Sequence, residues 1–315
     1  MTKFAFVFPG QGSQAIGMLN AFGDNIAVRD TVAEASEVLK TDLASLIATG
    51  PKELLDLTTN TQPVMLTAGV AMYRAWIAAG GPVPDLFAGH SLGEYSALVA
   101  AGILSFKDAV PLVRFRAEAM QQAVPVGQGG MAAILGLPDA DVIALCEESA
   151  QGDVVEAVNF NAPAQVVIAG SKAAVERACE LAKARGAKRA LILPVSAPFH
   201  SSLLKPASDR LRDYLAPLHF STGLVPVINN VDVEIVNDPA SLKDALVRQA
   251  ASPVRWVETI QKMAASGTSH VIECGPGKVL SGLTKRIDST LISDAIIDTA
   301  SLERVLELLK GVARS

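Results

Sequence analysis

Leu86-Phe87-Ala88-Gly89-His90-Ser91-Leu92-Gly93 decides the fold, because an apolar run enters this stretch and a helix-forming run, 94–101, leaves it. The pattern predicts a sharp strand-to-helix turn that exposes the Ser91 hydroxyl above a sheet, with a helix N-terminus behind it. Small residues at Gly89 and Gly93 would let the strand and the helix approach closely. Such a turn suits a nucleophile. The alternative interpretation is a glycine-rich turn that carries an incidental serine.

Strand-like and helix-like segments alternate around this turn, through the first 122 residues. The first strand is expected at 4–8, and long helices are expected at 61–79 and from Ser105 to about Gln122. Ser105 is followed three residues later by Asp108, a capping box that marks a helix start. Alternation of this kind predicts an α/β fold, in which helices cover a parallel sheet.

A proline and three glycines at 125–130 interrupt the alternation, and a different order of elements follows. The expected order is strand, helix, strand, strand, helix, strand, at 131–135, 139–149, 154–158, 165–169, 173–185 and 189–195. This is the ferredoxin-like order. We therefore predict an α/β-hydrolase-like main domain with a parallel sheet, discontinuous at 1–124 and 198–315, and a ferredoxin-like subdomain at 125–197 inserted into it.

The composition indicates a globular protein of enzyme size, with 315 residues of which 50% are hydrophobic and 19% charged. A net charge of -5 argues against a nucleic-acid-binding protein. No segment reaches the roughly 20 uninterrupted apolar residues of a membrane span, and the apolar start is too short for a signal peptide. Cys146, Cys179 and Cys274 lack C-x-x-C spacing, which favours reduced thiols. We therefore expect a cytoplasmic protein. We also expect no metal, because no cluster of His, Cys, Asp or Glu has the spacing of metal ligands.

A serine nucleophile needs a base within hydrogen-bond reach, and histidine is the usual one. Of the four histidines, His90 shares the tight turn with Ser91, where successive side chains diverge. His219 and His270 stand near predicted strands, so we interpret them as surface or edge residues. His200 lies in the loop that re-enters the main domain after the insertion, where a rigid scaffold typically presents catalytic groups. His200 is therefore the candidate base.

Attack on a carbonyl also needs donors for the oxyanion, and backbone N–H groups at a helix N-terminus serve well. Leu92, directly after the serine, supplies one. A second could come from Gly10-Gln11-Gly12-Ser13-Gln14, a loop that follows the first strand and is expected to lead into another helix. The alternatives are a phosphate-cradling loop or a plain turn. The loop lacks the lysine of a P-loop and the third glycine of a dinucleotide fingerprint.

Arg116 interrupts an apolar stripe on the helix predicted after Ser105. It shares one helix face with three apolar residues at spacings of three and four, namely Leu112, Val113 and Met120. A guanidinium that points inward needs an anion, and a substrate carboxylate would satisfy it with two hydrogen bonds. An arginine that snorkels to the surface, or pairs with a distant carboxylate, is the alternative.

These motifs together resemble those of the bacterial malonyl-CoA:acyl carrier protein transacylases, over essentially the whole chain. The residues that carry the resemblance are Gly10-Gln11-Gly12-Ser13-Gln14, Gly89-His90-Ser91-Leu92-Gly93-Glu94, Arg116 and Pro198-Phe199-His200. The inserted ferredoxin-like unit belongs to the same pattern. Related acyltransferase domains occur in polyketide synthases and animal fatty acid synthases, whereas the serine motif alone is shared with many hydrolases.

The resemblance implies a two-step transfer that supplies extender units for fatty acid biosynthesis. Ser91, deprotonated by His200, would attack malonyl-CoA and form a malonyl ester, which the phosphopantetheine thiol of acyl carrier protein would then attack. The oxyanion would lie on the backbone N–H groups of Gln11 and Leu92, and Arg116 would hold the malonyl carboxylate. No cofactor is implied, because malonyl-CoA is a substrate and the phosphopantetheine belongs to the partner. A polyketide pathway, or a serine thioesterase or hydrolase, is the alternative.

The resemblance also implies three further site residues. A main-chain carbonyl near Gln249 would orient His200, so that no aspartate is needed, and we group Gln249 with the substrate-binding residues. Asn159 would lie at the cleft between the subdomains. Phe199 would leave little room for an α-methyl group and so favour malonyl over methylmalonyl. The family expectation is a monomer that meets acyl carrier protein transiently, without nucleic-acid or membrane partners.

Overall fold

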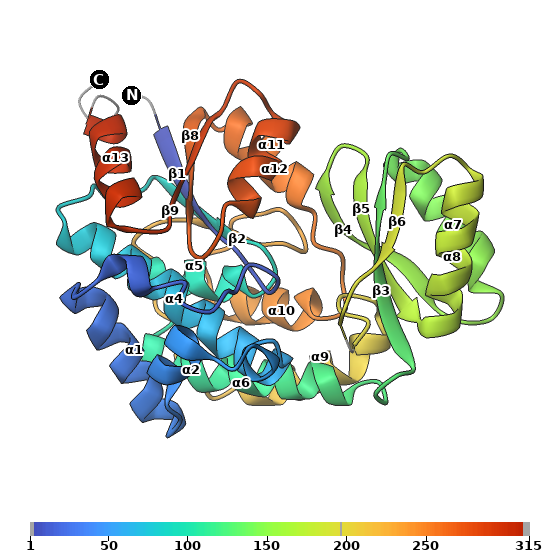
Figure 1. Cartoon of the computed structure of the whole chain (residues 1–315), viewed down its shortest axis with the longest axis horizontal. Helices are drawn as coiled ribbons and strands as arrows, with labels where there is room; N and C mark the ends of the chain where they lie inside the picture. The colour runs from blue at the N-terminus through green and yellow to red at the C-terminus, as the bar shows by residue number, and fades with distance from the viewer. Residues whose placement is uncertain (1–2, 196, 311–315) are drawn as a thin grey trace.

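A five-stranded sheet lies at the centre of the larger part of the molecule (Figure 1), in a computed structural model that describes residues 3–195 and 197–310. Its strand order is β7-β2-β1-β8-β9, and every pair of neighbours is parallel. The strands are β1 (Lys3–Phe8), β2 (Leu86–Gly89), β7 (Val227–Ile228), β8 (Thr268–Cys274) and β9 (Ile292–Ile296). Parallel strands end at one edge of the sheet, and β2 delivers the candidate nucleophile there.

Helices cover both faces of this sheet (Figure 1). They are α1 (Ile26–Leu39), α2 (Leu43–Thr49), α3 (Lys52–Leu55), α4 (Thr58–Ala78), α5 (Gly93–Ala100), α6 (Phe106–Gln122), α9 (Lys205–Leu215), α10 (Pro239–Gln249), α11 (Trp256–Ala265), α12 (Val279–Ile287) and α13 (Thr299–Lys310), with short 3-10 helices at Asn20–Phe22 and Ser202–Leu204. Strand β1 shows why two layers form. Its phenylalanines pack on one face with α4, and its Ala5 and Val7 pack on the other with α11 and α12.

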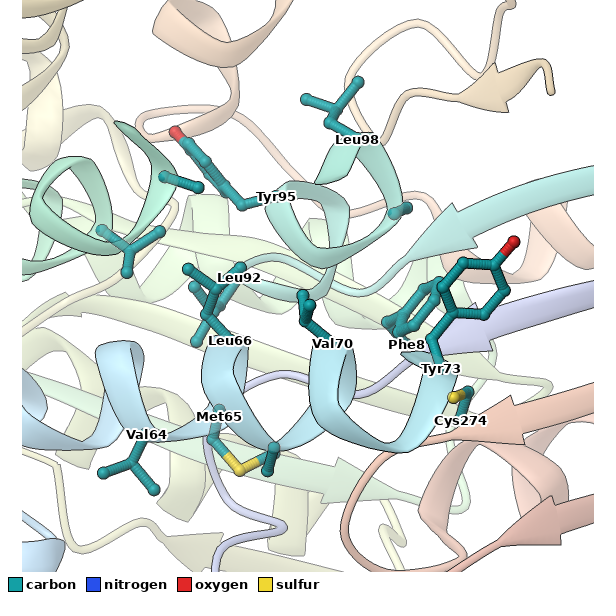
Figure 2. Packing of buried hydrophobic residues seen from close by; sticks show 14 of the residues in the cluster. Phe8, Val64, Met65, Leu66, Val70, Tyr73, Leu92, Tyr95, Leu98 and Cys274 are labelled. Atoms are coloured by element: carbon teal, nitrogen blue, oxygen red, sulfur yellow. The ribbon is translucent and has the colours of Figure 1, made fainter. Parts of the chain in front are cut away.

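Helix α4 runs through the larger core and is apolar on nearly every side. Figure 2 shows Leu66 and Val70 of this helix pointing toward α5, with Leu66 against Leu92. Tyr73 of α4 meets the rings of Phe6 and Phe8 edge to face, at centroid distances of 6.2 and 6.3 Å. Helix α4 therefore buttresses both the central strand and the residue that follows the candidate nucleophile.

A second, antiparallel sheet with order β4-β5-β3-β6 forms the small domain at the right of Figure 1. Its elements are β3 (Gly129–Leu135), α7 (Asp139–Ala150), β4 (Val155–Ala162), β5 (Gln165–Ser171), α8 (Lys172–Ala184) and β6 (Arg189–Ile192). Both helices pack on one face of the sheet and enclose a core of their own. The predicted fold class, a parallel α/β domain plus a ferredoxin-like unit, is confirmed. The exact domain limits stay a prediction.

The small domain contacts the main domain beside the chain segment that carries His200. The carboxylate of Glu156, on β4, accepts hydrogen bonds from the backbone N–H and the hydroxyl of Ser202, both at 2.7 Å. Ser202 stands two residues after the candidate base. The position of this loop therefore depends on the small domain as well as on the main one.

Some local predictions are confirmed and others are wrong. The capping box is confirmed, since the Asp108 N–H donates to the Ser105 hydroxyl at 3.1 Å. The loop after β1 does not enter a helix directly, because the next helical turn begins only at Asn20. The strand expected at 189–195 ends at Ile192. His270 is buried on β8, inside the sheet, and is neither a surface nor an edge residue. In the described ranges, no helix combines the length and apolarity needed to cross a bilayer.

Candidate active site

Ser91 lies in the turn that joins β2 to α5, with a backbone φ of 52°, in the left-handed region that non-glycine residues rarely adopt. Close backbone approach requires the flanking glycines. A Cβ at Gly89 would lie 1.8 Å from the carbonyl carbon of Gly93, and one at Gly93 would lie 2.0 Å from the oxygen of Phe8. The turn therefore has the geometry of a nucleophile elbow, as the sequence predicts.

His200 lies next to this serine, although 109 residues separate them. Its Nε2 is 2.7 Å from Ser91 Oγ, and its Nδ1 is 2.9 Å from the carbonyl oxygen of Gln249. Because a carbonyl can only accept, Nδ1 carries the proton, and the lone pair of Nε2 faces the serine hydroxyl. Burial, together with the nearby charge of Arg116, lowers the pKa of His200 to about 3. The imidazole is thus neutral and oriented as a general base without an aspartate.

The Arg116 guanidinium is buried, with 1% of the residue exposed, and it reaches the same serine. One terminal nitrogen donates to Ser91 Oγ at 3.1 Å and to Gln249 Oε1 at 2.9 Å, and the other donates to Gln62 Oε1 at 2.8 Å. The guanidinium carbon Cζ of Arg116 lies 5.3 Å from the Tyr95 ring centroid, which is a cation–π contact. The described residues provide Arg116 with amide acceptors and no carboxylate in salt-bridge contact. An incoming anion would therefore find a buried positive charge.

Two backbone amides lie where an oxyanion would need them. Leu92 and Gln11 both line the cavity above Ser91, and in the part of the chain that the structure describes neither N–H donates a hydrogen bond. The two loops touch, since a Cβ at Gly10 would lie 3.7 Å from the Leu92 nitrogen. The Gln11 side chain turns away and donates to Thr58 at 3.1 Å, which fixes its loop. This pair fits an oxyanion hole.

A cavity of ≈ 230 Å³ lies above Ser91, between the main and small domains. Residues of the small domain that line it include Met131, Asn159, Val167, Leu193 and Val195. The Oδ1 atom of Asn159 is buried and has no hydrogen-bond partner among the described residues. Phe199 also lines the cavity, beside the base. The wall is thus mainly apolar with a few polar groups, as ligand cavities usually are.

Gln249 does not line the cavity and is fully buried behind it. It would act on a substrate only through the groups that it holds, which are His200, Arg116 and Ser91. The predicted orienting carbonyl is in place, whereas direct contact between Gln249 and substrate is not.

Gln62, Glu94 and Asn230 are polar residues of the site whose roles were not predicted from the sequence. Gln62 accepts from Arg116, and Asn230 accepts from the backbone N–H of Ser91 at 2.7 Å. Glu94 is buried beneath the turn, and burial raises its pKa to about 7. One signal was available for Asn230, because it follows the apolar run 225–228, which contains strand β7, at the edge of the parallel sheet where sites of such folds lie.

Comparison with known proteins places this geometry in a family. The family model described as the acyl transferase domain matches residues 5–303. The chain belongs to the acyl transferase family. The resemblance drawn from the motifs is thereby confirmed, and the chain is an acyltransferase by its similarity to enzymes of that class over nearly its full length.

The relatives of this acyl transferase are named for malonyl transfer. The malonyl CoA-acyl carrier protein transacylase of Salmonella typhimurium is 56% identical and aligns over 97% of this chain and 99% of its own. The solved acyl-carrier-protein S-malonyltransferase of Burkholderia pseudomallei is 67% identical, with a TM-score of 0.96 over 97% of this chain and 100% of that one. A malonyl-transacylase solved in complex with a holo type II PKS acyl-carrier protein is 52% identical, with a TM-score of 0.96 over 98% and 100% of the two chains.

Proposed function

We propose that this acyl transferase moves the malonyl group from malonyl-CoA to the phosphopantetheine thiol of acyl carrier protein, through an ester on Ser91. One observation carries the proposal: Ser91 Oγ lies 2.7 Å from a neutral imidazole and 3.1 Å from a buried guanidinium, at one cavity. The imidazole supports nucleophilic attack, and the guanidinium supports an acyl group that ends in a carboxylate. The names of the relatives agree with this substrate pair.

In the first step, His200 Nε2 takes the proton of Ser91 as Oγ forms a bond to the thioester carbonyl carbon. The negative charge on the carbonyl oxygen would be stabilised by the N–H groups of Gln11 and Leu92. The carbon–sulfur bond then breaks, and the CoA thiolate receives the proton from His200. A malonyl-serine ester remains on the enzyme.

In the second step, the phosphopantetheine thiol gives its proton to His200 and attacks the ester carbonyl. The same two N–H groups would receive the oxyanion, and the Ser91–carbonyl bond breaks as Oγ takes the proton back. The proton and the acyl group are both accounted for in this cycle, and we propose that it needs no metal or resident cofactor. These two half-reactions make the proposed mechanism ping-pong.

Arg116→Ala is expected to weaken recognition of malonyl-CoA by about 1.5–3 kcal/mol, the usual worth of a hydrogen bond to a charged group. The neutral acetyl group has no carboxylate to lose, so the ratio of kcat/KM for malonyl-CoA over acetyl-CoA should fall by roughly 10- to 150-fold. Arg114→Ala is the control. Arg114 lies two residues before Arg116 on α6 and does not line the cavity. An unchanged ratio in Arg116→Ala would remove this residue from substrate recognition.

Phe199→Ala is expected to relax selectivity against methylmalonyl-CoA. The ring lines the cavity next to His200, and removing it opens room for an α-methyl group, which is worth about 1–3 kcal/mol in an apolar pocket. The measurement is the ratio of methylmalonyl to malonyl loading when both thioesters compete. A ratio equal to that of the wild type would show that Phe199 does not set this selectivity.

Intact mass spectrometry tests the proposed function directly. Mixing the enzyme with malonyl-CoA should add one malonyl group, and adding holo acyl carrier protein should move that mass to the carrier. A serine thioesterase, the alternative, would release malonate into water without a carrier. An acyl-enzyme that persists until the thiol arrives supports transfer, and rapid loss to water refutes it.

The biological setting is also part of the proposal. We place the enzyme in fatty acid biosynthesis, with a polyketide pathway as the alternative, since one similar structure holds a PKS carrier protein. The three cysteines are free and buried, which supports a reducing, cytoplasmic compartment. We also propose a monomer that meets its carrier transiently, because the nucleophile, the base and the two candidate oxyanion donors all belong to a single copy of the chain.

A further inference from the structure

The backbone of Ser91 is held on both sides by side chains that lie far away in the sequence. Its N–H donates to Asn230 Oδ1 at 2.7 Å, and its carbonyl oxygen accepts from Gln249 Nε2 at 3.0 Å. The same Asn230 donates through Nδ2 to the carbonyl oxygen of Gly89 at 2.6 Å. One asparagine thus bridges the end of strand β2 and the strained residue of the turn.

Glu94 joins these two contacts into one network. Its Oε2 accepts from the backbone N–H of Asn230 at 3.0 Å and from Gln249 Nε2 at 2.8 Å. Asn230 and Gln249 are fully buried, and Glu94 is 2% exposed. The chain of contacts therefore runs from the Ser91 amide through Asn230, Glu94 and Gln249 back to the Ser91 carbonyl.

This arrangement has a direct chemical consequence. A residue in the left-handed region persists only where its surroundings fix it. Here the contacts that fix Ser91 use its own N–H and carbonyl. The next amide, that of Leu92, belongs to a residue that lines the cavity and donates no hydrogen bond within the described residues. The orientation of the Ser91 hydroxyl and that of the Leu92 N–H thus depend on the same network of hydrogen bonds.

We propose that Asn230 and Glu94 are positioning residues that hold the Ser91 turn, so that Oγ faces His200 and the Leu92 N–H faces the reacting carbonyl. The role rests on the proposed acyl transfer. Neither residue lines the cavity, so each acts through Ser91 and not on the substrate. Binding of malonyl-CoA should therefore change little when Asn230 is altered, whereas the rate of acylation should change greatly.

The first test is Asn230→Ala, which removes both contacts to the turn. The rate constant of malonyl-Ser91 formation, measured by quenched-flow mass spectrometry, should fall on the order of 10²-fold, as expected for a misplacement of about 1 Å, with KM nearly unchanged. Asn229→Ala is the matched control, because Asn229 is a buried neighbour that bonds to the Asp232 N–H at 2.7 Å and not to the turn. It should leave the acylation rate of folded enzyme unchanged.

The second test, Asn230→Asp, separates positioning from mere loss of packing, since the residue keeps its size. A neutral carboxyl can donate to Gly89 and accept from Ser91 as the amide does, whereas a carboxylate cannot donate. The acylation rate of this variant, divided by that of the wild type at each pH, should therefore rise as the pH falls. The charged and titratable groups around the position are Glu94, Asp232, Arg248, Arg116 and His200, and the wild type shares them all.

The outcomes are distinct. Asn230→Ala within twofold of the wild type, or an equal loss in Asn229→Ala, overturns the inference. If Asn230→Ala does not fold, a flat ratio against pH for Asn230→Asp overturns it instead. Should the wild type take up no malonyl group, the proposed function fails, and the rate at which a fluorophosphonate labels Ser91 still decides the positioning role in the same variants.

Discussion

Replacing Ser91 with alanine should abolish acylation of the enzyme by malonyl-CoA. The hydroxyl oxygen lies 2.7 Å from His200 Nε2 and is also the atom that Arg116 contacts at 3.1 Å. Removing the nucleophile of a comparable site costs on the order of 10⁶ in kcat, and what remains comes from the oxyanion donors and binding. Intact mass spectrometry after incubation with malonyl-CoA measures the result.

Ser289→Ala, at an exposed serine that does not line the cavity, is the control for Ser91→Ala and should acquire the malonyl mass as the wild type does. A malonyl adduct that persists in Ser91→Ala would place the nucleophile elsewhere. Retained binding of malonyl-CoA in that variant, measured by calorimetry, would agree with an intact Arg116 subsite.

His200→Ala should lower the acylation rate by about 10²–10⁴-fold, the usual contribution of a general base. The loss should persist at saturating thioester concentration, because His200 is proposed to act on protons and not on binding. His219→Ala is the matched control, since His219 is exposed and lines no part of this cavity. Equal rates in both variants would exclude His200 as the base.

The same residue makes a prediction about pH. Because burial and Arg116 lower the pKa of His200 to about 3, its imidazole should remain neutral at pH 5, whereas an exposed histidine is largely protonated there. The unfolded chain takes up this proton near pH 6.5, so the free energy of unfolding should fall as the pH drops from 6.5 toward 3. Imidazole NMR signals, assigned with a His200→Gln variant, measure the midpoint. A midpoint near 6.5 would contradict the buried, neutral base.

How far the sequence predicts the structure depends on the range of each signal. The elbow at Ser91, the capping box at Ser105 and the inserted antiparallel unit depend on local spacing, and all three appear as predicted. The prediction of a helix directly after Gly10–Gln14 was wrong, and the reason is also local. Gly12 and Gly17 have φ values of 109° and 75°, which no helix tolerates, and this loop connects instead to α2 through Gly17 N–H and Ile47 O.

The network beneath Ser91 could not be predicted from spacing. Asn230 and Glu94 are 136 positions apart, and each is an ordinary polar residue in its own segment. Their roles arise only when the end of the short strand β7 lies beside β2, a pairing of two residues in each strand. Gln62 is similar, because a glutamine in the first turns of an apolar helix does not reveal that an arginine 54 positions later will donate to it.

The wall of the cavity has two parts, and only one of them carries the reactive groups. Reactive groups come from the larger domain, whereas Met131, Val167 and Leu193 of the inserted unit supply much of the apolar lining. The insertion leaves the chain after α6, which carries Arg116, and returns just before His200. Exchanging this one contiguous segment between family members would therefore change the apolar lining of the cavity and leave the residues around Ser91 unchanged. The hydrogen bonds from Ser202 to Glu156 would have to be kept.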